Sequence, residues 1–275
     1  MIVSPFTPLF FTTRKTDGIE SDYIQTFSTT DTILLQLFVP LDYDPVVLII
    51  EDPIGKTHSC IEFNEWKIST TTKLCFTEIY LPSGFYRVYI TGYGMSDVFR
   101  VTDDQNILSN TTLIQYSMNN NRQRTDTMFF IDGMQYFFDF RVPGGFKDSS
   151  WSFAVESEQF VTPLGDISQL FGLATTQKKF TLGGSIGVPV HFAEMLNRIL
   201  TCSHVYFDGI KYSRKESNVP EMTVQIEGVN SFVFTQMLQQ SINLDPIIEQ
   251  KNQFIIRRTE SDNYRSISET SNRKI

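Results

Sequence analysis

A serine and its neighbouring glycines are the first residues whose spacing could support chemistry. Gly183-Gly184-Ser185-Ile186-Gly187 matches the G-x-S-x-G pattern of a nucleophile elbow, in which the serine lies on a sharp turn between a strand and a helix. His204 follows Ser185 closely, and the chain lacks the repeated strand-helix units that build the parallel sheet of such hydrolases. We therefore expect these glycines to form a structural turn.

The same glycines could instead hold a phosphate, because a helix N-terminus exposes unpaired N–H groups. The segment lacks the Gly-Lys-Ser/Thr ending that reaches terminal phosphates, and Pro189 removes one N–H donor. These features disfavour nucleotide binding, and the sequence predicts no cofactor.

Histidine, glutamate and cysteine side chains suggest a metal site only weakly. His191 and Glu194 are one helical turn apart, and Cys202 and His204 follow them. Zinc needs three or four converging ligands, and this spacing lacks a second histidine at helical distance. The sequence therefore predicts no metal site, and we expect His58 and the other histidines to be ordinary surface or strand-end residues. Cys60, Cys75 and Cys202 have no C-x-x-C spacing and are expected to be free, buried thiols.

Charged clusters are expected to be solvated. Asp103-Asp104 and Glu156-Ser157-Glu158 resemble turn charge, and no carboxylate pair stands out as an acid/base couple, so the sequence predicts no catalytic residue. Arg122-Gln123-Arg124 and Arg257-Arg258 are interpreted as loop charge, with contact to an acidic partner or a phosphate backbone as the alternative.

The elements that position these residues belong to a chain rich in aromatic residues and poor in charge. The 275 residues include 24 Phe, only 20% are charged, and the net charge is −8. An acidic chain is not a general binder of nucleic acid, and its longest purely apolar run, 46–50, is too short for a membrane helix. Abundant Phe with sparse charge favours a subunit that completes its burial against copies of itself.

Strand-length apolar runs separated by turns fill the first hundred residues. They lie at 33–39, 46–50, 60–63, 74–81, 85–90 and 98–101. This spacing predicts an immunoglobulin-like β-sandwich over residues 23–105, preceded by an N-terminal arm at 1–22.

The following residues predict a second, β-rich domain at 106–250. Strands are expected at 112–116, 128–132 and 135–142, and Asp132-Gly133 and Asp208-Gly209 predict two-residue hairpins. One main helix is expected near 190–202, with a shorter helical turn at 166–173. The polar residues 251–275 are expected to form a C-terminal arm.

Residues 112–250 resemble a family of virion proteins of phages and prophages of Bacteroides and its relatives, including the crAss-like phages. The resemblance is carried by an ordered series of segments. They are Leu113-Ile114-Gln115-Tyr116-Ser117, Arg141-Val142-Pro143-Gly144-Gly145-Phe146, the run from Lys178 to Pro189, the helical Phe192-Ala193-Glu194-Met195-Leu196-Asn197-Arg198-Ile199, and the run from Asp208 to Glu216.

This resemblance implies a non-enzymatic structural subunit of a phage tail. Such a subunit would form a homo-oligomeric ring or head-tail connector below the portal, expected to hold twelve copies, beside portal, tail ring or tail hub proteins. It would be assembled in the bacterial cytoplasm, with DNA only as cargo passing through a channel and with no membrane partner. The alternative is a carbohydrate-binding or adhesin-type module, suggested by Tyr86, Tyr89 and Tyr93 on a β-scaffold.

Overall fold

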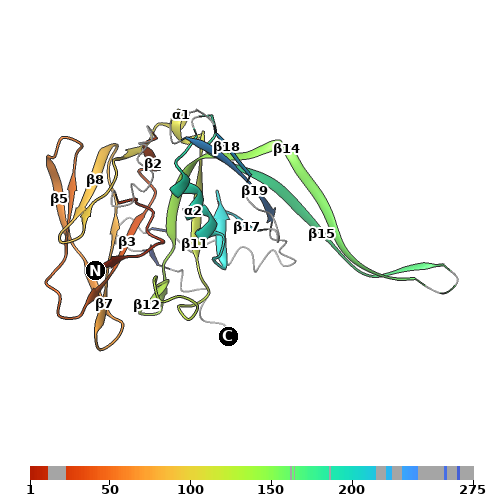
Figure 1. Ribbon diagram of the computed structural model, residues 1–275, viewed down its shortest axis with the longest axis horizontal. Coiled ribbons are helices and arrows are strands. Elements are labelled where there is room, and N and C mark those ends of the chain that lie inside the picture. Colours follow the sequence, from red (N-terminus) through yellow and green to blue (C-terminus); the bar gives the residue numbers. More distant parts are fainter. Residues whose placement is uncertain are drawn as a thin grey trace.

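A computed structural model describes residues 1–11, 23–161, 163, 165–185, 187–214, 221–224, 231–240, 257–258 and 265–266. The protein is mainly β, as the sequence predicts. Two N-terminal sheets lie beside a β-barrel, and a long hairpin projects from the barrel away from those sheets (Figure 1).

The N-terminal sheets enclose one hydrophobic cluster. The first sheet has the order β1 (Ile2–Val3), β3 (Ile33–Pro40), β7 (Thr72–Ile79) and β6 (Asn64–Lys67). The second has the order β2 (Gln25–Ser28), β10 (Phe99–Thr102), β8 (Gly84–Ile90), β4 (Val47–Glu51) and β5 (Thr57–Glu62), with β9 (Gly94–Met95) on β8. β3, β4, β5, β7, β8 and β10 match the six predicted runs to within a few residues, whereas no run was predicted for β1, β2, β6 or β9.

Alternation along β8 explains how these sheets form a core. Tyr86, Val88 and Ile90 are buried between the sheets, whereas Phe85 on the other face is 45% exposed. Successive side chains of a strand point to opposite faces, so a period of two buries one face and leaves the other outside.

Six antiparallel strands after the N-terminal sheets close into a barrel. Each strand pairs with the next, and the last pairs with the first. In spatial order they are β11 (Thr111–Ser117), β14 (Phe138–Val161), β15 (Ile167–Leu182), β19 (Phe232–Gln240), β17 (Ile210–Arg214) and β16 (His204–Phe207), while β18 (Glu221–Val224) adds to β19. Because the barrel is closed, each strand segment in it is hydrogen-bonded to a neighbouring strand on both sides.

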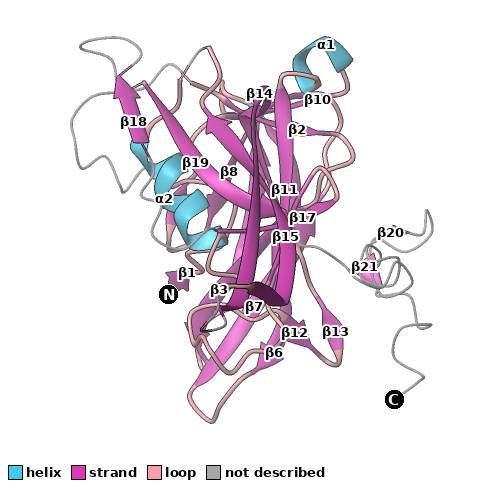
Figure 2. Ribbon diagram, turned by 90° about the vertical axis from the view of Figure 1, so that its right-hand side faces the viewer, coloured by secondary structure: helices cyan, strands magenta, loops and turns pink. Residues whose placement is uncertain are grey.

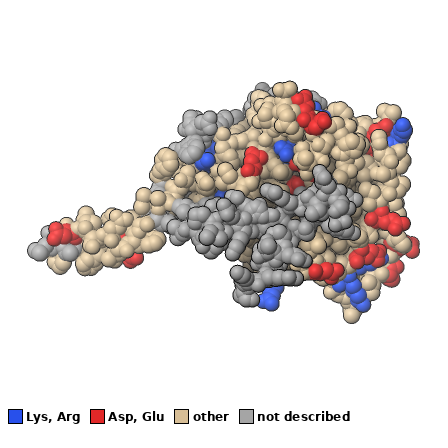
Figure 3. Space-filling model, turned by 180° about the vertical axis from the view of Figure 1, so that it is seen from behind, with Lys and Arg blue, Asp and Glu red and all other residues tan. Residues whose placement is uncertain are grey.

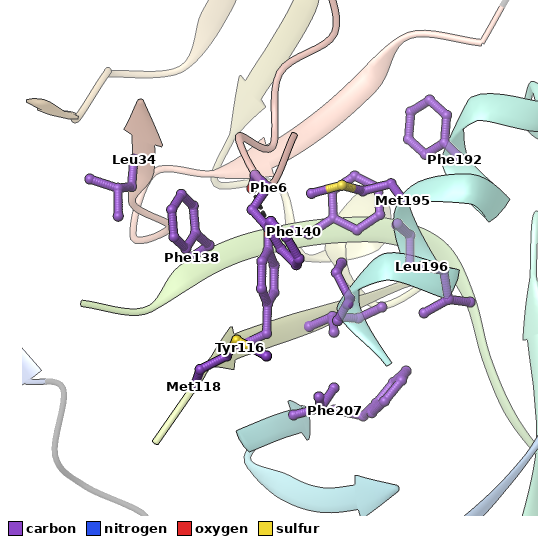
Figure 4. Close-up of a cluster of buried hydrophobic side chains, with 14 of the residues drawn as sticks. Phe6, Leu34, Tyr116, Met118, Phe138, Phe140, Phe192, Met195, Leu196 and Phe207 are labelled. Carbon is purple, nitrogen blue, oxygen red and sulfur yellow. Dashed lines mark hydrogen bonds between the residues drawn. The ribbon is translucent and has the colours of Figure 1, made fainter. Parts of the chain in front are cut away.

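The barrel strands share a large aromatic cluster with the helix α2 (Val190–Ile199) (Figure 4). Tyr116 stacks on Phe138 with ring centroids 5.4 Å apart, and Phe140 stacks on Phe192 of α2 at 5.6 Å. The helix begins after Pro189, as predicted, because proline presets the backbone angle φ for a first helical turn. It ends at Ile199, three residues before the predicted end at 202.

The N-terminal sheets and the barrel are bonded to each other through buried groups. Arg141 of β14 donates two hydrogen bonds, at 2.6 and 2.8 Å, to the carboxylate of Asp31. The Thr32 amide donates to Asp139 at 2.8 Å, and Phe6 from the N-terminal segment lies fully buried in the barrel cluster. The two parts therefore share packing as well as hydrogen bonds.

Short elements complete the described chain. The helix α1 (Gln105–Leu108) precedes β11, β12 (Phe130–Ile131) pairs with β13 (Met134–Gln135), and β20 (Arg257–Arg258) pairs with β21 (Arg265–Ser266). Asp132-Gly133 and Asp208-Gly209 both have positive φ at each residue, which confirms the two predicted hairpin turns.

Three expectations about local structure and cysteine burial are wrong. Residues 167–173 belong to β15 rather than to a helical turn, and Glu156-Ser157-Glu158 lies within β14 rather than in a turn. Both errors have one cause, because these segments become strands by pairing with each other, a non-local contact that local apolar spacing does not reveal. Cys60 is exposed rather than buried, although all three cysteines are free.

Candidate assembly site

The distal part of the β14–β15 hairpin is the most prominent surface feature of the protein. Residues 152–161 of β14 pair with 167–177 of β15 and project from the barrel, which β15 joins at Gln177 (Figure 1). At about 3.3 Å per residue, ten residues extend about 33 Å. Figure 2 views this ribbon from its distal end, in front of the body. We call residues 152–177 the arm.

Large apolar side chains cover the arm without being buried. Seven of them are more than half exposed: Phe153, Val155, Phe160, Val161, Ile167, Leu170 and Phe171. Phe153 is 76% exposed and Ile167 is 66% exposed. With roughly 150–200 Å² for each side chain, the arm presents on the order of 700 Å² of apolar surface. The largest apolar patch on a typical monomer is about 300–600 Å², so this arm has the character of a protein interface.

The root of the arm is fixed by the barrel. Residues 177–182 of β15 pair with β19, and Phe146 of β14 stacks on Tyr212 with ring centroids 4.7 Å apart. Gly144 has φ of +119°, and a Cβ atom there would collide with the carbonyl oxygen of Thr181 on the paired strand. Only glycine allows this close approach of two backbones, which sets the direction in which the arm leaves the barrel.

The arm region is acidic as well as apolar. Residues 152–177 contain Glu156, Glu158 and Asp166 and no lysine or arginine, whereas Lys147 lies before the arm and Lys178 and Lys179 follow it directly. Acidic atoms lie near its distal end in the space-filling view (Figure 3). Proteins that bind nucleic acid or anionic membranes concentrate positive charge at the contact. The composition of the arm therefore favours a protein partner.

The Gly183-Gly184-Ser185-Ile186-Gly187 segment forms a structural turn in its described residues. Gly183, Gly184 and Gly187 have positive φ, and a Cβ atom on Gly183 would lie 2.7 Å from the carbonyl oxygen of Phe232. The amide of Gly183 donates to the carbonyl of Pro143 at 2.9 Å. The glycines let the chain pass from β15 across the start of β19 into α2, as expected from the sequence.

Of the four residues that suggested a metal site, His191, Cys202 and His204 pack against other side chains, whereas Glu194 is exposed on α2. The His191 ring lies 4.3 Å from the ring of Phe10, and His204 lies beside Phe137 and Tyr206. Burial lowers the pKa of His204 to about 4 and raises the pKa of Cys202 to about 12. In the part of the chain that the structure describes, no three or more His, Cys, Asp and Glu side chains converge as metal ligands.

The charged clusters have local partners. Asp104 accepts the Asn106 amide at the start of α1, and Asp103 accepts the Ser83 hydroxyl at 2.9 Å. Arg124 forms two hydrogen bonds with Asp126 and lies over the Phe6 ring, so its interpretation as solvated loop charge is wrong. Arg257 and Arg258 form β20, and their side chains are outside the described residues.

The aromatic residues that suggested glycan binding do not form an exposed platform. Tyr86 is only 3% exposed and packs against Phe99 in the N-terminal core. Tyr93 packs against Phe11 with ring centroids 5.4 Å apart, and Tyr89 is half-buried. Within the described chain, no helix has the length and apolar character needed to cross a membrane.

Comparisons with known proteins give no relative. No family model, no curated protein sequence and no solved structure matches this chain.

The arm was not predicted from the sequence. The local sequence signal for this hairpin is Pro163-Leu164-Gly165, a composition typical of a turn. It lies between the segments that become β14 and β15.

Proposed function

We propose that this protein is a non-enzymatic structural subunit of a phage tail, which forms a ring or head-tail connector below the portal. The single observation that carries the proposal is the projecting arm with its exposed apolar side chains. The resemblance of residues 112–250 to virion proteins supplies the biological setting. In the proposed assembly, the N-terminal sheets form an immunoglobulin-like domain over residues 23–105.

The arm supports assembly because its apolar surface has the size of an interface. A standard protein–protein interface buries about 800 Å² per partner, close to the order of 700 Å² that the arm alone exposes. A chain that repeats one heterologous contact around an axis closes into a ring. Twelve copies would match the portal, and the net charge of −8 would keep the channel from gripping the passing DNA.

The first test is the oligomeric state of the purified chain. Light scattering after size exclusion should give one defined oligomer, and electron microscopy should show rings. A variant with residues 153–176 replaced by Asn-Gly should be monomeric, since this turn reconnects Ser152 and Gln177, which are paired in the hairpin. Ile210→Ser is the matched control, because it removes a 42% exposed apolar side chain outside the arm and should leave the oligomer intact.

Two results would overturn this proposal. A wild-type chain that stays monomeric at every concentration would remove self-assembly, and an oligomer unchanged by shortening of the arm would remove its supporting observation. The virion setting is tested separately by mass spectrometry of purified particles from a phage or induced prophage that carries this gene. Absence of the chain from those particles would refute a structural role in the tail.

A further inference from the structure

The two faces of the arm differ in charge. The irregularity after Glu158 adds a residue to β15 and none to β14, so residues 152–161 of β14 alternate regularly between the faces. We call the face of the odd-numbered residues the odd face and the other the even face. The glutamates of this stretch, Glu156 and Glu158, are at even-numbered positions. The odd-numbered positions carry no charge and are Phe153, Val155, Ser157, Gln159 and Val161.

The odd face is also the more open of the two. Val155 and Val161 are 62% and 59% exposed, and Ile167, which is paired with Val161, is 66% exposed. Residues paired across an antiparallel ladder lie on the same face, so Thr175, opposite Ala154, belongs to the even face. Thr175 is only 3% exposed, so the even face is covered near the root of the arm.

A partner can bury the odd face at the lower cost. Burial of a carboxylate without a counter-charge is unfavourable, and the cores of protein interfaces are depleted of charged residues. A contact through the odd face leaves Glu158 in water. The surface that receives this face should therefore be apolar and free of charge as well.

A row of such side chains crosses the second N-terminal sheet. Ile49 on β4 is paired with Cys60 on β5 and with Tyr89 on β8, so the three lie side by side on one face. Ile49 alternates with Leu48 and Ile50, which are buried in the N-terminal core, so this is the outer face of the sheet. Neither Ile49 nor Tyr89 is among the described members of the two hydrophobic clusters, and Cys60 is exposed.

Charged side chains lie beside this row rather than in it. Glu51 and Arg87 form an ion pair at 3.4 Å on one side, and Glu62 lies on the other side at the end of β5. Phe85, further along β8 on the same face, is 45% exposed. An apolar centre with charges at its rim is the usual composition of a protein interface.

We infer that the odd face of the arm of one copy packs on the outer face of the second N-terminal sheet of the next copy. This inference rests on the proposed self-assembly and names the two surfaces that meet. The arm and the strands β5 and β8 lie at opposite ends of the long axis of the molecule (Figure 1), so each copy can give its arm to one neighbour and receive another. Such a contact is heterologous and can repeat around a ring.

Disulfide cross-linking tests which face of the arm meets the row. Ser157 is on the odd face, Ser168 is on the even face opposite Phe160, and both serines are exposed. Under mild oxidation, Ser157→Cys should join Cys60 of the next copy and give a ladder of cross-linked chains on a non-reducing gel. Adding Cys60→Ser should abolish the ladder, and Ser168→Cys, the matched control, should give none.

A second pair of variants compares the two faces without oxidation. Val155→Lys places a charge on the odd face and should raise the concentration at which the oligomer dissociates by about tenfold or more. Phe160→Lys changes a larger apolar side chain, 54% exposed, on the even face and should alter this concentration less than about threefold. Light scattering over a dilution series measures both.

The outcomes separate this inference from the proposed function. Oligomers without a ladder from Ser157→Cys would overturn docking on the outer face and leave self-assembly standing. A ladder from Ser168→Cys, or a stronger effect of Phe160→Lys than of Val155→Lys, would overturn the choice of face. A ladder that persists after Cys60→Ser would show that arms contact arms, which also overturns the inference, and a monomeric wild-type chain would overturn both proposals.

Discussion

The buried ion pair between Asp31 and Arg141 gives the sharpest test of how the N-terminal sheets are joined to the barrel. The side chains are 1% and 11% exposed, and Asp31 also accepts the Ser28 amide at 2.7 Å. Asp31→Asn keeps an acceptor for Ser28 but leaves the Arg141 guanidinium without its counter-charge. Loss of one partner of a buried pair costs about 3–5 kcal/mol.

The expected free energies of unfolding form a double-mutant cycle. Asp31→Asn and Arg141→Met should each lower the free energy of unfolding by about 3 kcal/mol, whereas the double variant should lose only about 1–2 kcal/mol. Burial raises the pKa of Asp31 although Arg141 acts in the opposite direction, which indicates that the charged pair itself is only weakly stabilising. Removal of both charges therefore restores most of the lost stability.

The assay is thermal and urea unfolding followed by circular dichroism. For a chain of this size, 1 kcal/mol corresponds to about 2–4 °C, so each single variant should melt about 6–12 °C lower. The Arg141→Met deficit should shrink as the pH falls from 7 toward 5, because the raised pKa of Asp31 means that its protonation favours the folded state. Single variants that lose less than about 1 kcal/mol, or losses that simply add in the double variant, would refute this reasoning.

Three further outcomes are expected. Gly144→Ala should lower the free energy of unfolding by more than about 2 kcal/mol and redirect the arm, while Gly145→Ala, whose Cβ would lie 3.5 Å from the Thr112 hydroxyl, should cost under about 1 kcal/mol; urea unfolding measures both, and equal losses would contradict the close-approach argument. His204 has its pKa lowered to about 4 by burial, so wild-type stability should fall as the pH drops from about 6.5 to 4, and His204→Phe should flatten this part of the curve; an unchanged slope would show that His204 is not responsible. A thiol reagent should modify Cys60 first, since burial raises the pKa of Cys75 to about 11 and that of Cys202 to about 12; equal labelling rates would contradict their burial.

The sequence predicts the local elements of this fold better than their pairing. β3, β4, β7 and β8 follow alternation or turn residues, and Asp-Gly dipeptides mark two hairpins, so their evidence lies within ten residues of chain. Barrel closure depends on Lys178 pairing with Leu238, two residues that are distant in the sequence. The periodicity of apolar residues along the sequence does not indicate such a long-range contact.

The candidate site was missed for a related reason. Residues 152–161 show no clean alternation of polar and apolar side chains, and their described side chains are all exposed. A pattern that identifies strands by one buried face fails for a ribbon whose faces are both exposed. The exposure of both faces of this segment therefore explains both why the sequence pattern missed it and why its apolar side chains form a surface.

The composition of the chain becomes informative once the arm is located. Seven of the fourteen large hydrophobic side chains that are exposed in the described part lie on this one hairpin. An exposed apolar ribbon promotes aggregation in a protein that stays monomeric. The closed barrel and shared aromatic cluster bury the apolar side chains of the body, so the excess of apolar surface is concentrated at the arm. The same low charge that permits a large core therefore predicts that solubility depends on assembly, and the arm-shortened chain should remain soluble where a monomeric wild-type chain would aggregate.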